Sequence, residues 1–266
     1  MQVDTSLPGG WLQPAFTSPR VRALMTARDG GESAAPFDTM NLRDGLGDAA
    51  AAVARNRARL HQALGMPSVM LRQVHGVQVL DLVPGMADGT EADASVCLLP
   101  SLACEVQVAD CLPVLLADRQ GRGVAAAHAG WRGLAGGVIE ATLQRLCRAL
   151  DSSVAEVEVW LGPCIGPQAF EVGADVLAGF GVPAGAPGPR FRPVRPDKWL
   201  ADLPGLARDR LAALGVQRVA GNDGSQAWCT FSQPSRFFSY RRDGVTGRMA
   251  ACIGLLGIAR PGGPGN

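Results

Sequence analysis

Short apolar runs lie in clusters along this chain, and they do not alternate strictly with helical segments. Runs typical of buried β-strands cover residues 77–83, 92–98, 114–117, 123–127 and 157–161. A doubly wound parallel sheet needs a helical crossover between successive parallel strands, and several of these runs follow one another without one. The clustering therefore favours an α+β protein, a layered α/β sandwich with mixed β-sheets.

Three segments have the pattern of amphipathic helices. Residues 49–64 place their apolar side chains on one face, with Asp48 expected as the N-cap and Gly65 as the glycine that follows the helix. A second helix is predicted after Gly133 and a third over residues 199–214, both with leucines at helical spacing.

Two segments have no periodic pattern and are rich in proline and glycine. Residues 181–198 are expected to form a flexible surface excursion, and residues 261–266 a disordered tail. Residues 237–255 are predicted to form a hairpin, with a turn at an Asp-Gly pair. We expect residues 1–266 to form a single domain, because the motifs described below lie on both sides of the excursion.

Composition excludes several classes of function. The 25 basic and 24 acidic residues leave a net charge of +1, so no basic surface for nucleic acid or an anionic membrane is indicated. The longest nearly apolar run, 249–259, is about half of the ~20 residues that a membrane span needs. The seven cysteines are an odd number without a CxxC pair, which is typical of a reducing compartment. We therefore expect a cytoplasmic protein, and no protein partner is indicated.

Three short strings each place a metal-binding residue type at the end of an apolar run. LRQVHG contains His75, VADCLPVLLAD contains Cys111, and AAAHAGWRG contains His128. Two imidazoles and one thiolate suit Zn²⁺, and three protein ligands leave the fourth position for water or substrate. Nearby glycines such as Gly130 would let the backbone approach a ligand closely. The spacing, however, matches no compact zinc motif.

The same residues support two other kinds of site. Cys111 can be a nucleophile with His128 or His75 as its base and Asp110 as the orienting group, which would make a cysteine hydrolase or amidase. Alternatively, Asp110 is the fourth ligand of a closed structural zinc site in a binding domain that is not an enzyme. Spacing alone leaves these alternatives open.

Four arginines near these strings are candidates for binding an anionic or phosphorylated substrate. They are Arg28, Arg72, Arg132 and Arg241. Arginine is suited to this task because its planar guanidinium group binds phosphate through two hydrogen bonds. Each of them is equally compatible with a structural or surface role.

The order of these strings resembles that of a known family. LRQVHG, EADA, ADCLPVLLAD, AHAGWRG, LGPCIGP, FEVG, FFSYRRDG and TGRMA follow one another over residues 20–256, nearly the whole chain. In this the chain is similar to the YfiH family, also called the multicopper polyphenol oxidase or laccase-domain family. The resemblance implies a YfiH-like α/β sandwich and a zinc site whose ligands match His75, Cys111 and His128.

The resemblance also implies activities. It implies phosphorolysis of adenosine, inosine, guanosine and methylthioadenosine, and deamination of adenosine, with purine nucleosides and phosphate as the small-molecule partners. Another role attributed to the family is peptidoglycan editing, in which wrongly incorporated serine is removed from a precursor. A laccase is not expected, because the three histidines of the chain cannot supply a blue-copper site and a trinuclear cluster. We expect zinc, with copper possible only as a replacement.

Overall fold

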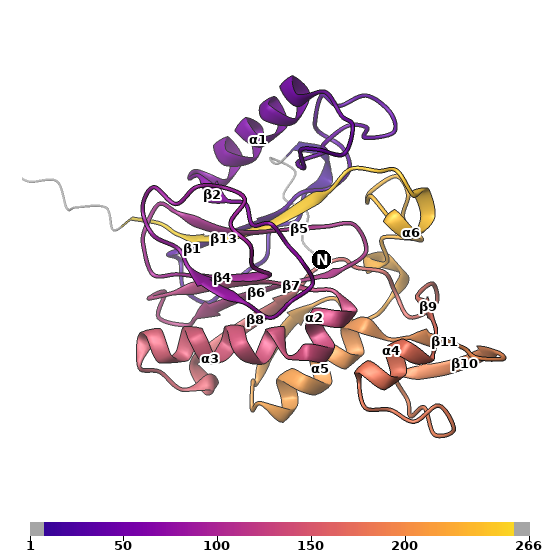
Figure 1. The fold of residues 1–266 in the computed structure, drawn as a ribbon. Coiled ribbons are helices and arrows are strands. Elements are labelled where there is room, and N and C mark those ends of the chain that lie inside the picture. Colours follow the sequence, from indigo (N-terminus) through magenta and orange to yellow (C-terminus); the bar gives the residue numbers. More distant parts are fainter. Residues whose placement is uncertain (1–7, 258–266) are drawn as a thin grey trace, which may run out of the picture.

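The structure, a computed structural model that describes residues 8–257, consists of four layers: one helix, two β-sheets and a group of helices (Figure 1). The larger sheet contains, in spatial order, β12 (Arg218–Gly221), β8 (Val157–Leu161), β6 (Leu112–Asp118), β7 (Val124–Ala129), β4 (Ala94–Cys97) and β3 (Val79–Asp81). The second sheet contains β1 (Val21–Met25), β13 (Met249–Leu255), β5 (Ala103–Val108) and β2 (Ser68–Val69).

Helices lie on the outer faces of the two sheets and toward one end of the molecule (Figure 1). They are α1 (Ala50–Leu64), α2 (Trp131–Gly136), α3 (Val138–Leu150), α4 (Ala174–Gly179), α5 (Leu203–Ala213) and α6 (Tyr240–Asp243), with short 3₁₀ turns at Pro8–Gly10, Val154–Glu156 and Gln226–Trp228. α1 packs on the four-stranded sheet, and α3 and α5 pack on the six-stranded sheet (Figure 1). A small third sheet of β10 (Phe191–Arg195), β11 (Lys198–Ala201) and β9 (Glu171–Val172) projects beside α4.

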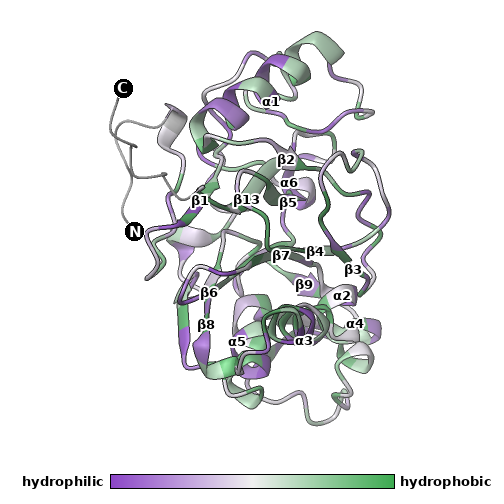
Figure 2. Cartoon of the chain, turned by 90° about the vertical axis from the view of Figure 1, so that its left-hand side faces the viewer, coloured by the Kyte–Doolittle hydropathy of each residue, from purple (hydrophilic) through white to green (hydrophobic). Residues whose placement is uncertain are grey.

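The central strands are buried on both faces, which explains why they read as continuous apolar runs. In β6, Leu112 and Val114 pack toward the helices, whereas Leu115 and Ala117 pack against the other sheet. The two-residue period of a strand thus divides one apolar run between two layers of the core. In Figure 2, β4 and much of β7 accordingly have hydrophobic colours.

The expected sandwich with mixed sheets is confirmed. β12 pairs with β8, β3 with β4, and β2 with β5 in parallel, and the remaining pairs of the two large sheets are antiparallel. The five predicted strand segments correspond to β3, β4, β6, β7 and β8. No helix within residues 8–257 has the length and hydrophobicity of a membrane span.

The predicted hairpin over residues 237–255 is wrong. Phe237 and Phe238 are buried in the core, and the Ser239 hydroxyl accepts a hydrogen bond from the Arg242 N–H, which caps the short helix α6. β13 then pairs with β1 and β5, which come from distant parts of the chain. The local Asp-Gly signal was therefore overridden by long-range strand pairing.

The third helix begins later than predicted, because Lys198–Ala201 is a strand paired with β10 and β9. Asp202 accepts a hydrogen bond from the Gly205 N–H and begins α5. The region 181–198, expected to be an excursion without regular structure, contains β10. The tail 261–266 lies outside the described residues.

The other helix boundaries are corrected in detail. The second helix is two helices, α2 and α3, separated by Gly137 at a φ of +98°. The N-cap of α1 is Ala49 instead of Asp48, whose carboxylate accepts hydrogen bonds from the Asn41 side chain and the Ala49 N–H. Gly65 ends α1 as expected, with a φ of +80° that favours glycine.

Candidate metal centre

The chain crosses between the two large sheets at one edge of the sandwich, and the candidate ligands lie there. Cys111 is in the turn from β5, in the four-stranded sheet, to β6, in the six-stranded sheet. His75 is in the loop from β2 to β3, which makes the same crossing. His128 is on β7, and because Val124 and Ala126 face the space between the sheets, the two-residue period places His128 on that side.

The structure brings His75, Cys111 and His128 together. Their nearest ligand atoms all lie within 4.8 Å of one another, and Cys111 Sγ is 3.7 Å from His75 Nε2. Zinc–ligand distances of ~2.0–2.3 Å in a tetrahedron put neighbouring donor atoms roughly 3.5 Å apart, so two imidazoles and a thiolate at this spacing fit a metal ion. His128 is buried, whereas His75 is exposed. The three residues form a potential metal site that is open on one side.

Asp93 holds both histidines. Its buried carboxylate accepts hydrogen bonds from the main-chain N–H groups of Val74, His75 and Gly76, at 2.7–3.1 Å. Its Oδ1 also lies 2.8 Å from Nδ1 of His128, which leaves Nε2 of that ring for a ligand. These contacts fix the His75 loop, in which His75 itself has a φ of +62°.

Two further features shape the surroundings of the three-residue cluster. The side chain of Gln73 makes two hydrogen bonds with the main chain of Gln107, at 2.7 and 2.8 Å, and so ties the His75 loop to β5. A Cβ atom on Gly130 would lie 2.7 Å from His75 Cδ2 and 3.0 Å from Cys111 Sγ. Only glycine fits at this position without displacing the cluster, as expected from its place in the sequence.

The charges within the cluster favour a thiolate. Burial alone would raise the pKa of the Cys111 thiol, but the neighbouring His128 and His75 lower it to about 6. Burial would lower the pKa of His128, but the Cys111 thiolate and the Asp93 carboxylate raise it to about 9. Burial would raise the pKa of Asp93, yet hydrogen bonds from His128 and the main chain hold it below its usual range. A thiolate is the form of cysteine that binds metal or acts as a nucleophile.

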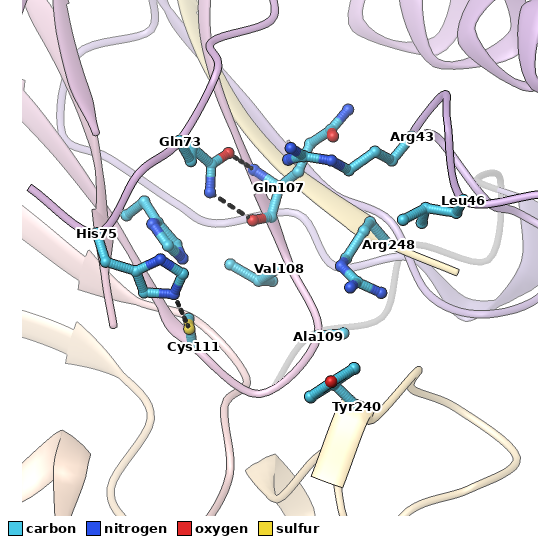
Figure 3. A pocket seen from close by; sticks show the side chains of 11 residues that line it. Arg43, Leu46, Gln73, His75, Gln107, Val108, Ala109, Cys111, Tyr240 and Arg248 are labelled. Atoms are coloured by element: carbon cyan, nitrogen blue, oxygen red, sulfur yellow. Dashed lines mark hydrogen bonds between the residues drawn. The ribbon is translucent and has the colours of Figure 1, made fainter. Parts of the chain in front are cut away.

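The cluster forms one wall of a cavity of about 420 Å³ (Figure 3). This volume is in the range of small-molecule sites. His75 and Cys111 lie on one side, and Arg43, Arg248 and Tyr240 lie on the other, with Val108 and Ala109 between them. The structure thus places cationic and aromatic side chains opposite the candidate ligands.

Asp110, expected as a catalytic or metal-binding residue, has its carboxylate directed elsewhere. It accepts hydrogen bonds from the Thr230 hydroxyl at 2.6 Å and from the Arg241 N–H at 2.7 Å. Its φ is +94°, and its carbonyl oxygen accepts from the Ile165 N–H. Asp110 therefore holds the turn that carries Cys111, and it does not belong to the three-residue cluster.

The four arginines expected to bind phosphate do not line this cavity. Arg72 pairs with Glu91 at 2.5 Å, and Arg28 donates to the carbonyl oxygen and carboxylate of Asp38. The guanidinium carbon of Arg132 lies 4.3 Å from the centre of the ring of its neighbour Trp131. Arg241 donates to the Glu171 carbonyl oxygen. In this structure all four guanidinium groups contact other parts of the protein.

Sequence reasoning assigned no role to the residues that complete the site. They are Asp93, Arg43, Arg248 and Tyr240. A signal was present for three of them, because Asp93 lies in EADA, Tyr240 in FFSYRRDG and Arg248 in TGRMA. Those strings indicate that the segments matter without showing which side chains meet.

Comparison with known proteins gives consistent matches over nearly the whole chain. The profile of the family described as multi-copper polyphenol oxidoreductase laccase matches residues 22–256. A Pseudomonas aeruginosa protein named purine nucleoside phosphorylase is 47% identical over 247 residues, which cover 92% of this chain and 98% of that protein. The Escherichia coli purine nucleoside phosphorylase YfiH is 45% identical, over 91% of this chain and 98% of its own length.

Solved structures share the fold. The crystal structure of a Neisseria meningitidis protein is 43% identical, with a TM-score of 0.84, over 93% of this chain and 99% of that chain. YlmD from Geobacillus stearothermophilus has the same TM-score at 29% identity, over 93% of this chain and 96% of its own. The layered architecture is therefore common to relatives whose sequences differ widely.

Proposed function

Since the chain belongs to the multi-copper polyphenol oxidoreductase laccase family, of which YfiH is a relative, we propose that it is a purine nucleoside phosphorylase whose active site is the described cavity. The observation that carries this proposal is the meeting of His75, Cys111 and His128 on one wall of that cavity. The names of the relatives supply the kind of reaction, and the cavity supplies the place for it.

The proposed metal is zinc, held by His75, Cys111 and His128. The donor set of two nitrogens and one sulfur supports this choice, because zinc prefers borderline and soft ligands in tetrahedral geometry. When bound, zinc would supply a Lewis acid beside the reacting group. The proposed role of Asp93 is to accept a hydrogen bond from the Nδ1–H of His128, so that Nε2 of the ring faces the metal position.

The proposed substrates are adenosine, inosine, guanosine and methylthioadenosine, with deamination of adenosine as a second reaction. In phosphorolysis, a phosphate oxygen bonds to C1′ of the ribose while the bond from C1′ to the purine nitrogen breaks. The purine keeps the electron pair of that bond and takes up a proton. The exposed ring of Tyr240 at the cavity mouth supports a purine substrate, because aromatic rings stack on flat bases.

The cytoplasm is the proposed place of action. All seven cysteines are free thiols, the state that a reducing compartment maintains.

The test is product analysis. The purified protein is incubated with adenosine, with and without phosphate, and the products are identified by mass spectrometry. Adenine and ribose 1-phosphate that form only with phosphate are expected, and inosine would add the deamination. If neither mixture yields a product, and inosine and guanosine are equally inert, the phosphorylase proposal is wrong.

A second candidate function, a cysteine-type amide hydrolase that removes wrongly incorporated serine from a peptidoglycan precursor, is favoured by one observation. Asp93, His128 and Cys111 follow one another as carboxylate, imidazole and thiol, with the Asp93–His128 contact at 2.8 Å. In that reaction the Cys111 sulfur bonds to the amide carbon, the carbon–nitrogen bond breaks, and the amine leaves with a proton from His128. Water then releases the acid.

The two candidates differ in the fate of Cys111. An electrophilic amide analogue would form a covalent adduct on Cys111 of a hydrolase, which mass spectrometry of the intact protein detects. A thiolate held by a metal ion resists that reaction, so absence of the adduct together with bound zinc excludes the hydrolase.

A further inference from the structure

Two neighbouring arginines of the described site have no carboxylate partner among residues 8–257. Arg43 comes from the loop before α1, and Arg248 directly precedes β13. Both line the cavity on the wall opposite His75 and Cys111 (Figure 3). The guanidinium of Arg248 donates to the carbonyl oxygens of Thr246 and Gly247. Within residues 8–257, the guanidinium of Arg43 has no hydrogen bond or ion pair, and Arg248 has no ion pair with a carboxylate.

This arrangement differs from that of other arginines in the chain. Arg190 pairs with both Asp202 and Asp209, and Arg195 pairs with Glu171. In contrast, burial and the neighbouring charge of Arg43 lower the pKa of Arg248, and the nearby Cys111 and Asp110 offset this only in part. Two like charges in one cavity are unfavourable unless an anion joins them.

The chemistry of the guanidinium group selects the kind of anion. Its planar donors match the oxygen atoms of phosphate, and two such groups can bind different oxygens of one dianion. The Tyr240 ring also lines the cavity on this side, with its centroid 5.7 Å from the guanidinium carbon of Arg248. An anion held here would face the metal-ligand cluster across the cavity (Figure 3).

We propose that Arg43 and Arg248 form the phosphate subsite of this cavity, and that its occupant is inorganic phosphate. The choice of inorganic phosphate rests on the proposed function, in which phosphate is the second substrate, whereas the anion site itself rests on the geometry. The same chemistry would bind the phosphoryl group of a phosphorylated substrate, so the experiment has to separate the two sources.

The test compares phosphate binding by the purified protein and three variants in isothermal titration calorimetry. Arg43→Gln is the principal variant, because among the described residues the Arg43 guanidinium makes no hydrogen bond or ion pair that the substitution would break. Arg248→Lys keeps the positive charge but loses the planar group that can donate two parallel hydrogen bonds to one phosphate. Arg192→Gln is the matched control, because Arg192 is an exposed residue of β10 outside the cavity and its loss changes the net charge equally.

We expect Arg43→Gln and Arg248→Lys each to weaken phosphate binding at least tenfold, with metal content and circular dichroism unchanged, and Arg192→Gln to bind as the parent does. Equal affinity in all four proteins overturns the subsite. If inosine 5′-monophosphate binds at least tenfold more tightly than phosphate and depends on the same arginines, the assignment of inorganic phosphate is overturned.

Activity measurements separate this inference from the proposed function. If nucleosides are cleaved but the KM for phosphate is the same in Arg43→Gln and Arg248→Lys, the subsite is wrong and the phosphorylase stands. If phosphate binding depends on both arginines but no nucleoside is cleaved, the anion site stands and the phosphorylase is wrong.

Discussion

Oδ1 of Asp93 lies 2.8 Å from Nδ1 of His128, and the same carboxylate accepts the main-chain N–H groups of the loop that carries His75. One buried side chain therefore positions two of the three candidate ligands. Metal sites generally depend on such hydrogen bonds, because they fix the orientation of the imidazole and raise its basicity.

Asp93→Asn is expected to lower metal affinity about 10- to 100-fold, since the amide presents one acceptor oxygen to four donors. Metal content after dialysis against a graded chelator measures this. Asp118→Asn is the matched control, because Asp118 is also a buried carboxylate that accepts main-chain N–H groups, but it lies at the far end of β6. Equal metal retention by the two variants would contradict the role given to Asp93.

Cys111→Ala is expected to lose bound metal and turnover together, because it removes the only sulfur ligand of the cluster. Elemental analysis and the nucleoside assay measure the two effects on the same preparation. Cys147→Ala, which changes a partly buried thiol on α3, should retain both. A Cys111→Ala protein with full metal content and activity would show that the site lies elsewhere.

Alkylation of Cys111 in metal-free protein should develop with a midpoint near pH 6, because its thiol pKa is lowered to about 6. The sign follows from the thiolate being the reactive form, so the rate rises as pH increases through the pKa. The pKa of Cys147 is raised by burial, so that thiol should stay slow at neutral pH. Mass spectrometry after timed exposure to iodoacetamide locates the label. A rate that rises only above pH 8 would refute the lowered pKa.

Gly130→Ala should displace the His75 and Cys111 side chains from the positions in which they could bind a metal ion. The new Cβ would lie 2.7 Å from the His75 ring and 3.0 Å from the Cys111 sulfur. We expect loss of metal affinity with a folded protein. In Gly185→Ala, the added Cβ has no atom within 4 Å, so that variant should bind metal normally. Metal titration followed by absorbance or calorimetry compares them, and unchanged affinity in Gly130→Ala would mean that the cluster rearranges without cost.

Stability should depend on pH through Asp118. Burial would raise the pKa of this carboxyl, but hydrogen bonds from Arg122 and the main chain lower it below its usual value. Its contribution is therefore present above a pH of about 4, and is lost as pH falls through the lower pKa of the folded state. Denaturant unfolding of Asp118→Asn should show a deficit of about 1–3 kcal/mol at neutral pH that shrinks in acid. A deficit independent of pH would contradict this.

Features that depend on residues close in sequence can be predicted from the sequence, whereas features that depend on pairing between distant segments cannot. The strand 157–161 was predicted at its observed bounds, and Gly65 ends α1 as expected, because apolar runs and helix ends are local features. The hairpin over 237–255 failed because β13 pairs with β1 and β5 instead of with its neighbour in sequence. The helix predicted from residue 199 failed because Lys198–Ala201 belongs to a sheet whose partners no local pattern reveals.

For this protein, the sequence by itself determined which segments are buried, the mixed character of the sheets, and the three residue types suited to a metal ion. Only the tertiary structure decided that Asp93 holds both histidines and that Asp110 faces Thr230. It also decided that Arg43 and Arg248 line the cavity, whereas the four arginines expected from the sequence do not. The physical reason is that burial and periodicity are encoded along the chain. The partner of a charged side chain, in contrast, depends on which distant segments the packed sheets bring within hydrogen-bonding distance.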